Sequence, residues 1–283
     1  MLTMKNDFFK DLSSEEYEIL ANKGTEPPFS GEYNDHYEPG FFICRACSNK
    51  LYESNTKFNS GCGWPSFDDE VEGAIVRYED RSLGRVRTEI CCANCDGHLG
   101  HVFHGEKITE KDTRHCVNSL SIRFVAYKNL KKATFGAGCF WKVQNIFADL
   151  NGVYDTCVGY MGGITKSPTY DEVCSGKTNH AEVVQITYNP KEIKFENLLF
   201  AFWENHNPTT LNKQGNDAGT QYRSVIFFHS PDQKDIAQKS KKEFQKNINE
   251  VIVTEIVEKK DFFRAEEYHQ NYLKKNNLGL CDV

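Results

Sequence analysis

The stretch from Gly136 to Val143 reads G-A-G-C-F-W-K-V and places one cysteine, Cys139, between two glycines and two aromatic residues. Directly after it, apolar residues recur at helical spacing, at Val143, Ile146, Phe147 and Leu150. That spacing predicts an amphipathic helix, with Gly152 at its C-terminal end. Cys139 is then expected at the helix N-terminus, where unpaired backbone N–H groups and the helix dipole favour a thiolate. A buried thiol without chemistry is the alternative interpretation.

The pattern of the chain changes near residue 130. Before it, short strand-like runs separated by loops predict a mostly antiparallel β domain, at residues 41–44, 73–78, 86–91, 99–103 and 120–126. After the basic connector K-N-L-K-K, strands alternate with amphipathic helices, and strands are expected at residues 182–188, 222–228 and 251–257. We therefore expect an α+β protein of two domains, residues 1–130 and 131–283, for which 283 residues suffice.

Composition excludes several classes of function. Hydrophobic residues make up 39% of the chain and charged residues 26%, which is typical of a globular protein. The net charge of -6 argues against nucleic-acid binding, which needs clustered Lys and Arg. The N-terminus lacks a signal-like apolar region, and no segment reaches the roughly 18 apolar residues that span a bilayer. We expect a cytoplasmic protein that binds neither membrane nor nucleic acid.

Four of the eleven cysteines form two C-x-x-C knuckles, at Cys44, Cys47, Cys92 and Cys95. Each knuckle can chelate from one tight turn, so the pair predicts a Zn²⁺ ion held by four thiolates. A site saturated in this way is structural. Cys91 is an alternative to Cys92, although the two-residue spacing favours Cys92, and His98 is an alternative further ligand. A redox-active C-x-x-C pair is the competing interpretation.

Two other cysteines of this half have contrasting surroundings. Cys116, in R-H-C-V-N-S, opens an alternating strand beside Arg114 and His115, whose positive charge would favour a thiolate. Cys62, in S-G-C-G-W-P-S-F, sits between glycines in a loop. Cys116 is thus a candidate nucleophile, and two buried apolar thiols are the alternative.

Long motifs in both halves resemble known reductases. Residues 12–127 resemble a type B methionine sulfoxide reductase, through the two knuckles and the motifs G-T-E-P-P-F-S-G-E-Y, D-H-Y-E-P-G, S-G-C-G-W-P-S-F, H-L-G-H-V-F and R-H-C-V-N-S. From residue 133 to the end the chain resembles a type A methionine sulfoxide reductase, through G-A-G-C-F-W, V-G-Y-M-G-G, P-T-Y-D-E-V-C-S-G, H-A-E-V-V and G-N-D-A-G-T-Q-Y-R-S.

The resemblance implies a bifunctional fusion in which the type B domain comes first and the type A domain is an α/β sandwich with a ferredoxin-like core. It implies reduction of methionine sulfoxide, free or in proteins, with the S epimer taken by the type A half and the R epimer by the type B half. Each half would form a cysteine sulfenic acid and then a disulfide, which thioredoxin reduces. Structural zinc is the one cofactor implied, and no organic cofactor is expected.

In the type A half, the resemblance makes Cys139 the nucleophile and Cys281, near the C-terminus, the resolving thiol. It places Phe140 and Trp141 in the wall around the S-methyl group. Proton transfer to the sulfoxide oxygen falls to Glu182, assisted by Tyr170, Tyr222 and Asp217. The residues themselves indicate that Glu182 shares the apolar face of its strand, so burial should raise its pKa toward neutrality. A salt-bridged Glu182 is the alternative.

In the type B half, the resemblance makes Cys116 the nucleophile and Cys62 the resolving thiol. Further active-site positions match His98, His101, Arg114 and Asn118, and Trp64 matches the methyl-binding wall. The chain departs from the type A pattern at Lys142, Gln144 and Ala218, and Cys157 and Cys174 are alternatives to Cys281 as resolving thiols.

Three other functions fit parts of the pattern. A cysteine protease would use Cys139 with a distant histidine, which His206-Asn207 offers, but it leaves Cys281 and H-A-E-V-V unexplained. A zinc-dependent binding or redox-sensing module would need no turnover. A general disulfide oxidoreductase would need a redox-active C-x-x-C pair that holds no metal.

Overall fold

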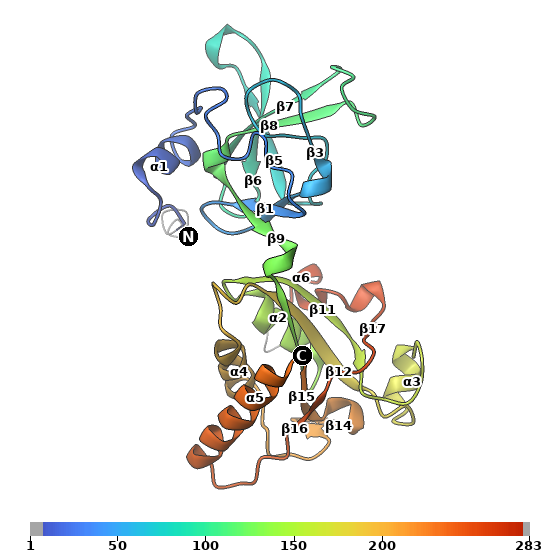
Figure 1. The fold of residues 1–283 in the computed structure, drawn as a ribbon. Helices are drawn as coiled ribbons and strands as arrows, with labels where there is room; N and C mark the ends of the chain where they lie inside the picture. Colours follow the sequence, from blue (N-terminus) through green and yellow to red (C-terminus); the bar gives the residue numbers. More distant parts are fainter. Residues whose placement is uncertain (1–7, 280–283) are drawn as a thin grey trace. The chain divides into compact units, whose positions relative to one another are not determined.

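The computed structural model describes residues 8–279 and divides the chain into two compact units, which meet between Asn129 and Leu130 (Figure 1). Both units combine sheets with helices. The predicted α+β class is therefore confirmed. Each unit is described by itself below.

Two antiparallel sheets form the N-terminal unit, and in both of them every pair of neighbouring strands is antiparallel. The smaller sheet has the order β2-β1-β9 and consists of β1 (Gly40–Cys44), β2 (Lys50–Glu53) and β9 (Ile122–Ala126). The larger sheet has the order β3-β4-β8-β7-β6-β5 and consists of β3 (Lys57–Phe58), β4 (Ser66–Phe67), β5 (Ile75–Asp80), β6 (Arg87–Cys92), β7 (His98–His104) and β8 (Thr113–Val117).

The core of this unit consists mainly of aromatic and aliphatic side chains, and β1 is buried along its whole length. Tyr52 and Phe67 are fully buried and stack with ring centroids 4.2 Å apart, and Phe42 meets Phe67 edge to face at 5.0 Å. The short helix α1 (Ser14–Leu20) adds Leu20 to this core. It begins at a capping box in which Ser13 and Glu16 satisfy each other's backbone N–H groups.

A single twisted sheet organises the C-terminal unit, with the strand order β16-β15-β10-β12-β11-β17. Its strands are β10 (Lys131–Ala137), β11 (Val153–Met161), β12 (Ala181–Tyr188), β15 (Ser224–Phe228), β16 (Glu255–Glu258) and β17 (Phe263–Arg264). All neighbours are antiparallel except β15 and β16, which are parallel. A separate hairpin joins β13 (Lys213–Gln214) to β14 (Asp217–Ala218).

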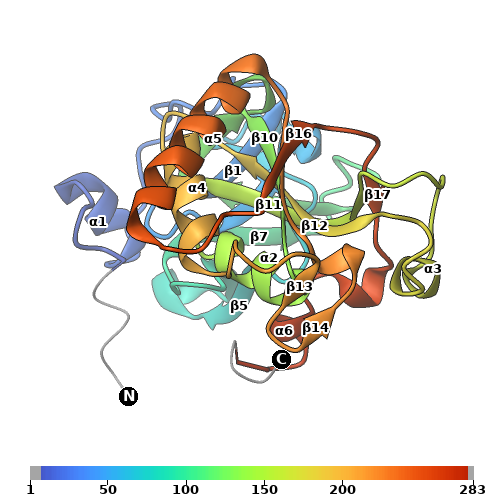
Figure 2. The ribbon, with the colours of Figure 1, turned by 90° about the horizontal axis from the view of Figure 1, so that it is seen from below.

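Helices pack against one face of this sheet and bury its main core. Phe135 on the central strand β10 stacks on Phe147 and Phe202 at 5.2 Å each, and these residues come from α2 (Phe140–Ala148) and α4 (Phe195–Glu204). Figures 1 and 2 show α4 beside α5 (Pro231–Phe244). Two short helices complete the unit, α3 (Tyr170–Cys174) and α6 (Tyr272–Lys275). Cys139 follows the end of the central strand β10, so the packing of this core determines where the thiol lies.

Some predicted boundaries are wrong for local reasons. The helix after Cys139 ends at Ala148 with Asp149 as its C-cap, and Gly152 instead occupies a turn with φ +90 that leads into β11. The strand expected at residues 222–228 begins only at Ser224, because a 3-10 turn precedes it. Within residues 251–257, the backbone of Val253 bonds to Pro208, so pairing with β15 begins at Glu255.

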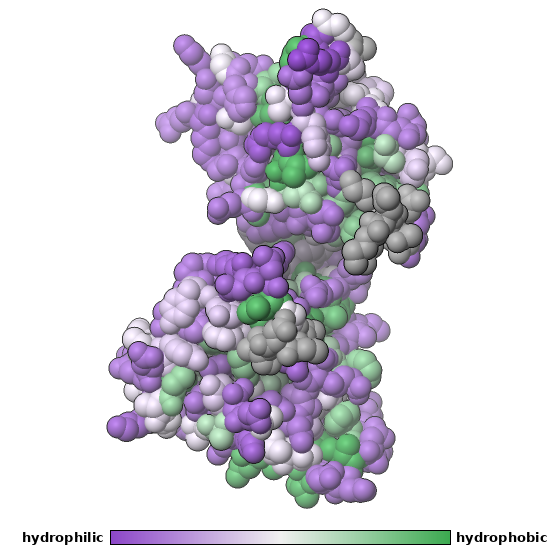
Figure 3. Space-filling model, turned by 180° about the vertical axis from the view of Figure 1, so that it is seen from behind, coloured by the Kyte–Doolittle hydropathy of each residue, from purple (hydrophilic) through white to green (hydrophobic). Residues whose placement is uncertain are grey.

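The face of the molecule in Figure 3 is mostly hydrophilic, with apolar side chains in small separate patches. Among residues 8–279, no helix combines the length and the apolar character that crossing a bilayer requires.

Candidate active sites

Cys139 is the N-cap of α2, one residue beyond a sharp turn that ends β10. Gly138 makes this turn with φ +90, a conformation in which side chains are strained. A Cβ at Gly138 would also collide with the Gln214 side chain. Gly136, the other glycine of this motif, lies within β10 and not in the turn, and a Cβ there would meet Val225 at 2.8 Å.

Glu182 lies on β12 and contacts the start of α2. Its Oε2 accepts the backbone N–H of Phe140 at 3.1 Å, and its side chain is buried, with 1% of the residue exposed. Burial raises the pKa of Glu182 to about 8, and the charge of Asp217 acts in the same direction. The prediction that burial raises this pKa toward neutrality is therefore confirmed.

The Cys139 thiol is harder to ionise than its position at a helix N-terminus predicts. Burial raises the pKa of Cys139 to about 11, and the negative charge of Glu182 adds to this. Hydrogen bonds from the N–H groups of Trp141 and Lys142 oppose the rise without cancelling it. The expectation of an easily formed thiolate in the free protein is wrong, because loss of solvent outweighs the helix terminus here.

Three more predicted residues, Tyr170, Tyr222 and Asp217, interact electrostatically with Glu182 or Cys139. Tyr170 is the first residue of α3, and Tyr222 ends the 3-10 turn that leads into β15. Burial and the Glu182 charge raise the pKa of both hydroxyls, that of Tyr222 to about 12. Asp217 is exposed on β14, and its charge raises the pKa of Cys139, Glu182 and Tyr222. The structure thus gathers five predicted residues from separate elements.

The two aromatic residues after Cys139 differ in exposure. Phe140 is buried, whereas Trp141 is half-buried and stacks on Tyr272 with ring centroids 3.8 Å apart. The Trp141 indole N–H donates to His269 Nδ1 at 3.0 Å. Trp141 therefore presents an apolar ring that other residues hold in place.

The sequence analysis did not predict that a C-terminal segment lies beside this site. In A-E-E-Y-H-Q-N-Y, Glu266 accepts the Tyr170 backbone N–H at 3.0 Å and the Tyr160 hydroxyl at 2.9 Å, and His269 accepts from Trp141. The available signal was a glutamate and a histidine three residues apart among aromatic residues.

The thiols offered as resolving partners of Cys139 lie in different environments. Cys281 lies outside the described residues. Cys157 on β11 accepts from Arg264 Nη1 at 2.9 Å, and Cys174 is exposed at the end of α3. Among the departures from the type A pattern, Gln144 is buried and bonds to the backbone of Thr156 and Asn271, whereas Lys142 and Ala218 are exposed.

In the N-terminal unit, Cys62 and Cys116 are in contact. Their sulfurs are 3.7 Å apart, and Cys116 lies opposite Ser66 on β4 and His101 on β7. A hydrogen bond between the sulfurs lowers the pKa of Cys62 to about 4 and raises that of Cys116, so the pair ionises by losing one shared proton.

Of the two residues expected to place positive charge beside Cys116, only Arg114 does so. Arg114 lowers the pKa of Cys116, lies over the Phe103 ring at 4.5 Å, and donates two hydrogen bonds to Glu106. Burial lowers the pKa of His115 to about 4, so this ring is neutral at pH 7, and the expectation that it adds positive charge is wrong.

Each histidine of H-L-G-H-V-F has a carboxylate partner that sequence reasoning missed. His98 Nδ1 lies 2.8 Å from Glu89 Oε1, and His101 Nε2 lies 2.9 Å from Asp80 Oδ2. Burial lowers the pKa of His98. The two rings are 5.6 Å apart, so both predicted histidines lie on the side of the sheet that carries Cys116.

Asn118 and Trp64 meet through the backbone of Glu26. The Trp64 indole donates to the Glu26 carbonyl at 3.0 Å, and Asn118 Oδ1 accepts the Glu26 N–H at 3.1 Å. Asn118 Nδ2 donates to the Leu99 carbonyl. Both ends of the Asn118 amide are thus engaged with backbone, so Asn118 holds in place the Glu26 backbone to which Trp64 donates.

The four knuckle cysteines converge. Their sulfurs all lie within 4.8 Å of one another, with Cys44 3.6 Å from Cys95 and Cys47 3.5 Å from Cys92. Zn–S bonds of about 2.3 Å require tetrahedral sulfurs roughly 3.8 Å apart, so the donor set fits Zn²⁺. The alternative ligands belong elsewhere: Cys91 and His98 both contact Glu89.

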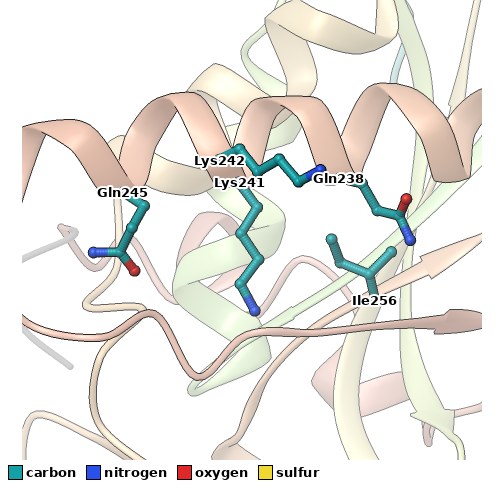
Figure 4. Close-up of a pocket in the computed structure, with 5 residues that line it drawn as sticks. All are labelled: Gln238, Lys241, Lys242, Gln245 and Ile256. Carbon is teal, nitrogen blue, oxygen red and sulfur yellow. The ribbon is translucent and has the colours of Figure 1, made fainter.

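The principal cavities lie away from these thiols. One of about 800 Å³ borders α1 and the Glu26 loop. Another of about 550 Å³ lies between α5 and β16 and is lined by Gln238, Lys241, Lys242, Gln245 and Ile256 (Figure 4). Lys241 donates to the Thr254 carbonyl at 2.7 Å, so this lysine joins the helix to the segment before β16. Neither of these two cavities is lined by Cys62, Cys116 or Cys139.

Comparison with known proteins connects both units to one chemistry. The family model of the peptide methionine sulfoxide reductases matches residues 131–283, and the model of the SelR domain, the type B reductase, matches residues 12–126. A peptide methionine sulfoxide reductase from Lactuca sativa is 55% identical over 50% of this chain and 55% of its own length, so the match spans about half of that relative. The reductase MsrA of Methanoculleus marisnigri is 53% identical over 54% of this chain and 95% of its own.

Two solved structures agree. Reduced Mxr1 from Saccharomyces cerevisiae matches with a TM-score of 0.52 and 41% identity, over 54% of this chain and 89% of its own. Methionine sulfoxide reductase A of Corynebacterium diphtheriae matches with a TM-score of 0.50 and 37% identity, over 53% and 77%.

Proposed function

This chain belongs to the peptide methionine sulfoxide reductase family, and from that premise we propose that Cys139 and Cys116 are the nucleophiles of two separate sites, one for each sulfoxide epimer. Its chemistry is reduction of methionine sulfoxide by a type B unit followed by a type A unit. The assignment of individual residues rests on the contacts described above.

At the type A site, the Cys139 sulfur attacks the sulfoxide sulfur while Glu182 gives its proton to the oxygen. The oxygen then passes to Cys139, so this cysteine becomes a sulfenic acid and the substrate leaves as methionine. The pKa of about 8 supports this role, since Glu182 still holds its proton at neutral pH. Tyr170 and Tyr222 stay protonated and can donate hydrogen bonds to the same oxygen. The charge of Asp217 raises the pKa of Glu182 and so helps this carboxyl to keep its proton.

At the type B site, the same exchange takes place at Cys116. His98 and His101 supply hydrogen bonds, Arg114 supplies positive charge, Trp64 forms the methyl wall, and Asn118 holds the Glu26 backbone to which Trp64 donates. The Cys62 thiol then attacks the Cys116 sulfenic acid, which forms a disulfide and releases water. The 3.7 Å distance between Cys62 Sγ and Cys116 Sγ carries the proposal, because the resolving thiol already touches its target.

The cycle needs an external dithiol, for which we propose thioredoxin in a reducing, cytoplasmic setting. Cys281 is proposed to resolve the type A sulfenic acid. Cys44, Cys47, Cys92 and Cys95 would hold a structural Zn²⁺ ion that joins two distant turns of the N-terminal unit. Asn49, which donates to the Cys92 sulfur at 3.6 Å, would support that ligand from outside.

An assay that separates the epimers tests the assignment. Purified protein with thioredoxin or dithiothreitol should reduce both epimers of methionine sulfoxide. Cys139→Ser should abolish turnover of the S epimer alone and Cys116→Ser that of the R epimer alone. Retention of both activities in either variant would exclude the assignment.

A further inference from the structure

We propose that His269 and Glu266 form a positioning pair that holds the substrate wall Trp141 and the hydrogen-bond donor Tyr170 in a fixed relation across the type A site. The inference rests on the proposed function, because it concerns how that site binds the S epimer. Neither residue needs to touch the substrate, and both act through the side chains they hold.

His269 orients Trp141 through a bond that only one tautomer can make. The indole N–H is a donor only, and it donates to His269 Nδ1 at 3.0 Å. Nδ1 must therefore lack a proton, and the neutral ring carries its proton on Nε2. Burial, with 1% of His269 exposed, lowers its pKa and favours this neutral form. The bond fixes the rotation of the indole about its own axis.

The His269 ring also fills the space between aromatic residues of the site. It lies 5.1 Å from the Phe140 ring and 4.5 Å from the Tyr170 ring, measured between centroids. Tyr272 covers Trp141 by stacking at 3.8 Å. Trp141 is thus held by a stacking partner and by a hydrogen bond, and one chain segment supplies both.

Glu266 connects the segment that holds Trp141 to Tyr170 and Tyr160. Its Oε1 accepts the backbone N–H of Tyr170, and its Oε2 accepts the Tyr160 hydroxyl. His269 Nε2 lies 3.9 Å from the same Oε2 and has no closer hydrogen-bond partner among the described residues. Since α3 has only five residues and cannot hold itself as an isolated helix, Glu266 anchors its first turn.

His269 should therefore control binding more than the chemical step. Trp141 contacts the substrate in the ground state and in the transition state alike, so loosening it should raise KM. The proton transfer from Glu182 stays in place, since Glu182 bonds to Phe140 and not to this segment. Loosening Tyr170 through Glu266 should add a loss in kcat.

Paired variants at His269 test the proposal. His269→Leu removes the acceptor, and we expect KM for the S epimer to rise about 3- to 10-fold, the range typical of one lost hydrogen bond. His269→Asn places an amide oxygen near the Nδ1 position and should restore most of the affinity. In a Trp141→Phe background, which has no indole N–H, His269→Leu should have no further effect on KM. R-epimer turnover by the same chain is the internal control.

Glu266→Gln tests the second half of the pair, and Glu267→Gln is its matched control because Glu267 is 71% exposed beside it. We expect kcat for the S epimer to fall in Glu266→Gln and to stay unchanged in Glu267→Gln. A ¹⁵N NMR spectrum of the native protein gives an answer without any variant: His269 should show an unprotonated Nδ1 and a protonated Nε2.

The opposite tautomer would overturn the proposal, as would a native KM in folded His269→Leu or an equal effect of that substitution with and without Trp141. These results leave the proposed function standing as long as the native chain reduces the S epimer. A native chain that fails to reduce it would instead remove the proposed function.

Discussion

His101 lies opposite Cys116 where β7 pairs with β8, and its Nε2 is 2.9 Å from Asp80 Oδ2 on β5. Residues directly opposite in an antiparallel pair project to the same face of the sheet. The register therefore brings an imidazole beside Cys116, the proposed nucleophile, with a carboxylate behind it. The Ser82 backbone N–H and, at 2.6 Å, Arg87 also donate to this carboxylate and lower the pKa of Asp80, so Asp80 stays ionised and keeps its bond to the ring.

Asp80→Asn should lower R-epimer turnover by roughly tenfold, because the amide no longer fixes the orientation and proton position of His101. S-epimer turnover by the same chain should not change. The measurement is kcat/KM for each epimer, with Asp69→Asn, at an exposed aspartate of the same unit, as the matched control. An equal loss for both epimers would point to unfolding and contradict the specific role.

Cys62→Ser should separate the first turnover of the type B site from later ones. The Cys116 sulfenic acid would still form and one equivalent of methionine would still appear, but no disulfide could follow. The measurement is a single-turnover burst of R-epimer product, with the sulfenic acid trapped by a dimedone reagent and located by mass spectrometry. Absence of the burst, in a chain that still reduces the S epimer, would show that Cys62 does more than resolve.

The pH profile of the S-epimer reaction should depend on Glu182 and Cys139 together. The reactive form has Glu182 protonated and Cys139 ionised, so kcat/KM should rise up to a pH of about 8, level off, and fall above about 11. Glu182→Gln should lower kcat/KM by about 10²-fold or more and remove the change of slope near pH 8. A slope change that persists in Glu182→Gln would assign that ionisation to another group.

The same carboxyl should make the stability of the C-terminal unit depend on pH. The pKa of Glu182 is raised above its ordinary value of 4.5, so the folded state binds the extra proton between pH 4.5 and about 8. This contribution is fully present below pH 4.5, decreases by at most about 1.4 kcal/mol per pH unit, and is lost above about pH 8. Hydrogen exchange of the β12 amides measures it. The dependence should flatten in Glu182→Gln, and an unchanged slope would contradict the assignment.

Metal content should distinguish Cys92 from its neighbour Cys91. Cys92→Ser removes one of four converging sulfurs, so bound zinc should fall and the N-terminal unit should unfold at a lower temperature. Cys91→Ser is the matched control and should retain one zinc per chain, since the Cys91 sulfur contacts Glu89 instead. Elemental analysis with thermal melting decides. Equal zinc loss in both variants would contradict the four-cysteine site.

Several features of the sites followed from local pattern. The spacing of the knuckles indicated which four cysteines converge, and the two-residue period of β12 placed Glu182 on a buried face. The ionisation of Cys139 did not follow, because a helix N-terminus is a local property whereas burial depends on everything packed around it. The positive charge predicted for His115 was wrong for the same reason, because burial in the core lowers the pKa of the ring and leaves it neutral.

The sequence by itself determined the mixed fold and the family, and it indicated the thiols that we propose as nucleophiles, because these rest on periodicity and on motifs a few residues long. Only the tertiary structure decided which side chains hold the site together. Glu266 reaches Tyr170 from 96 positions away along the chain, His269 reaches Trp141 from 128 positions away, and Asp80 reaches His101 across two intervening turns. Such pairings depend on strand register and chain path, which bring distant residues within hydrogen-bond distance and leave no mark in the local pattern.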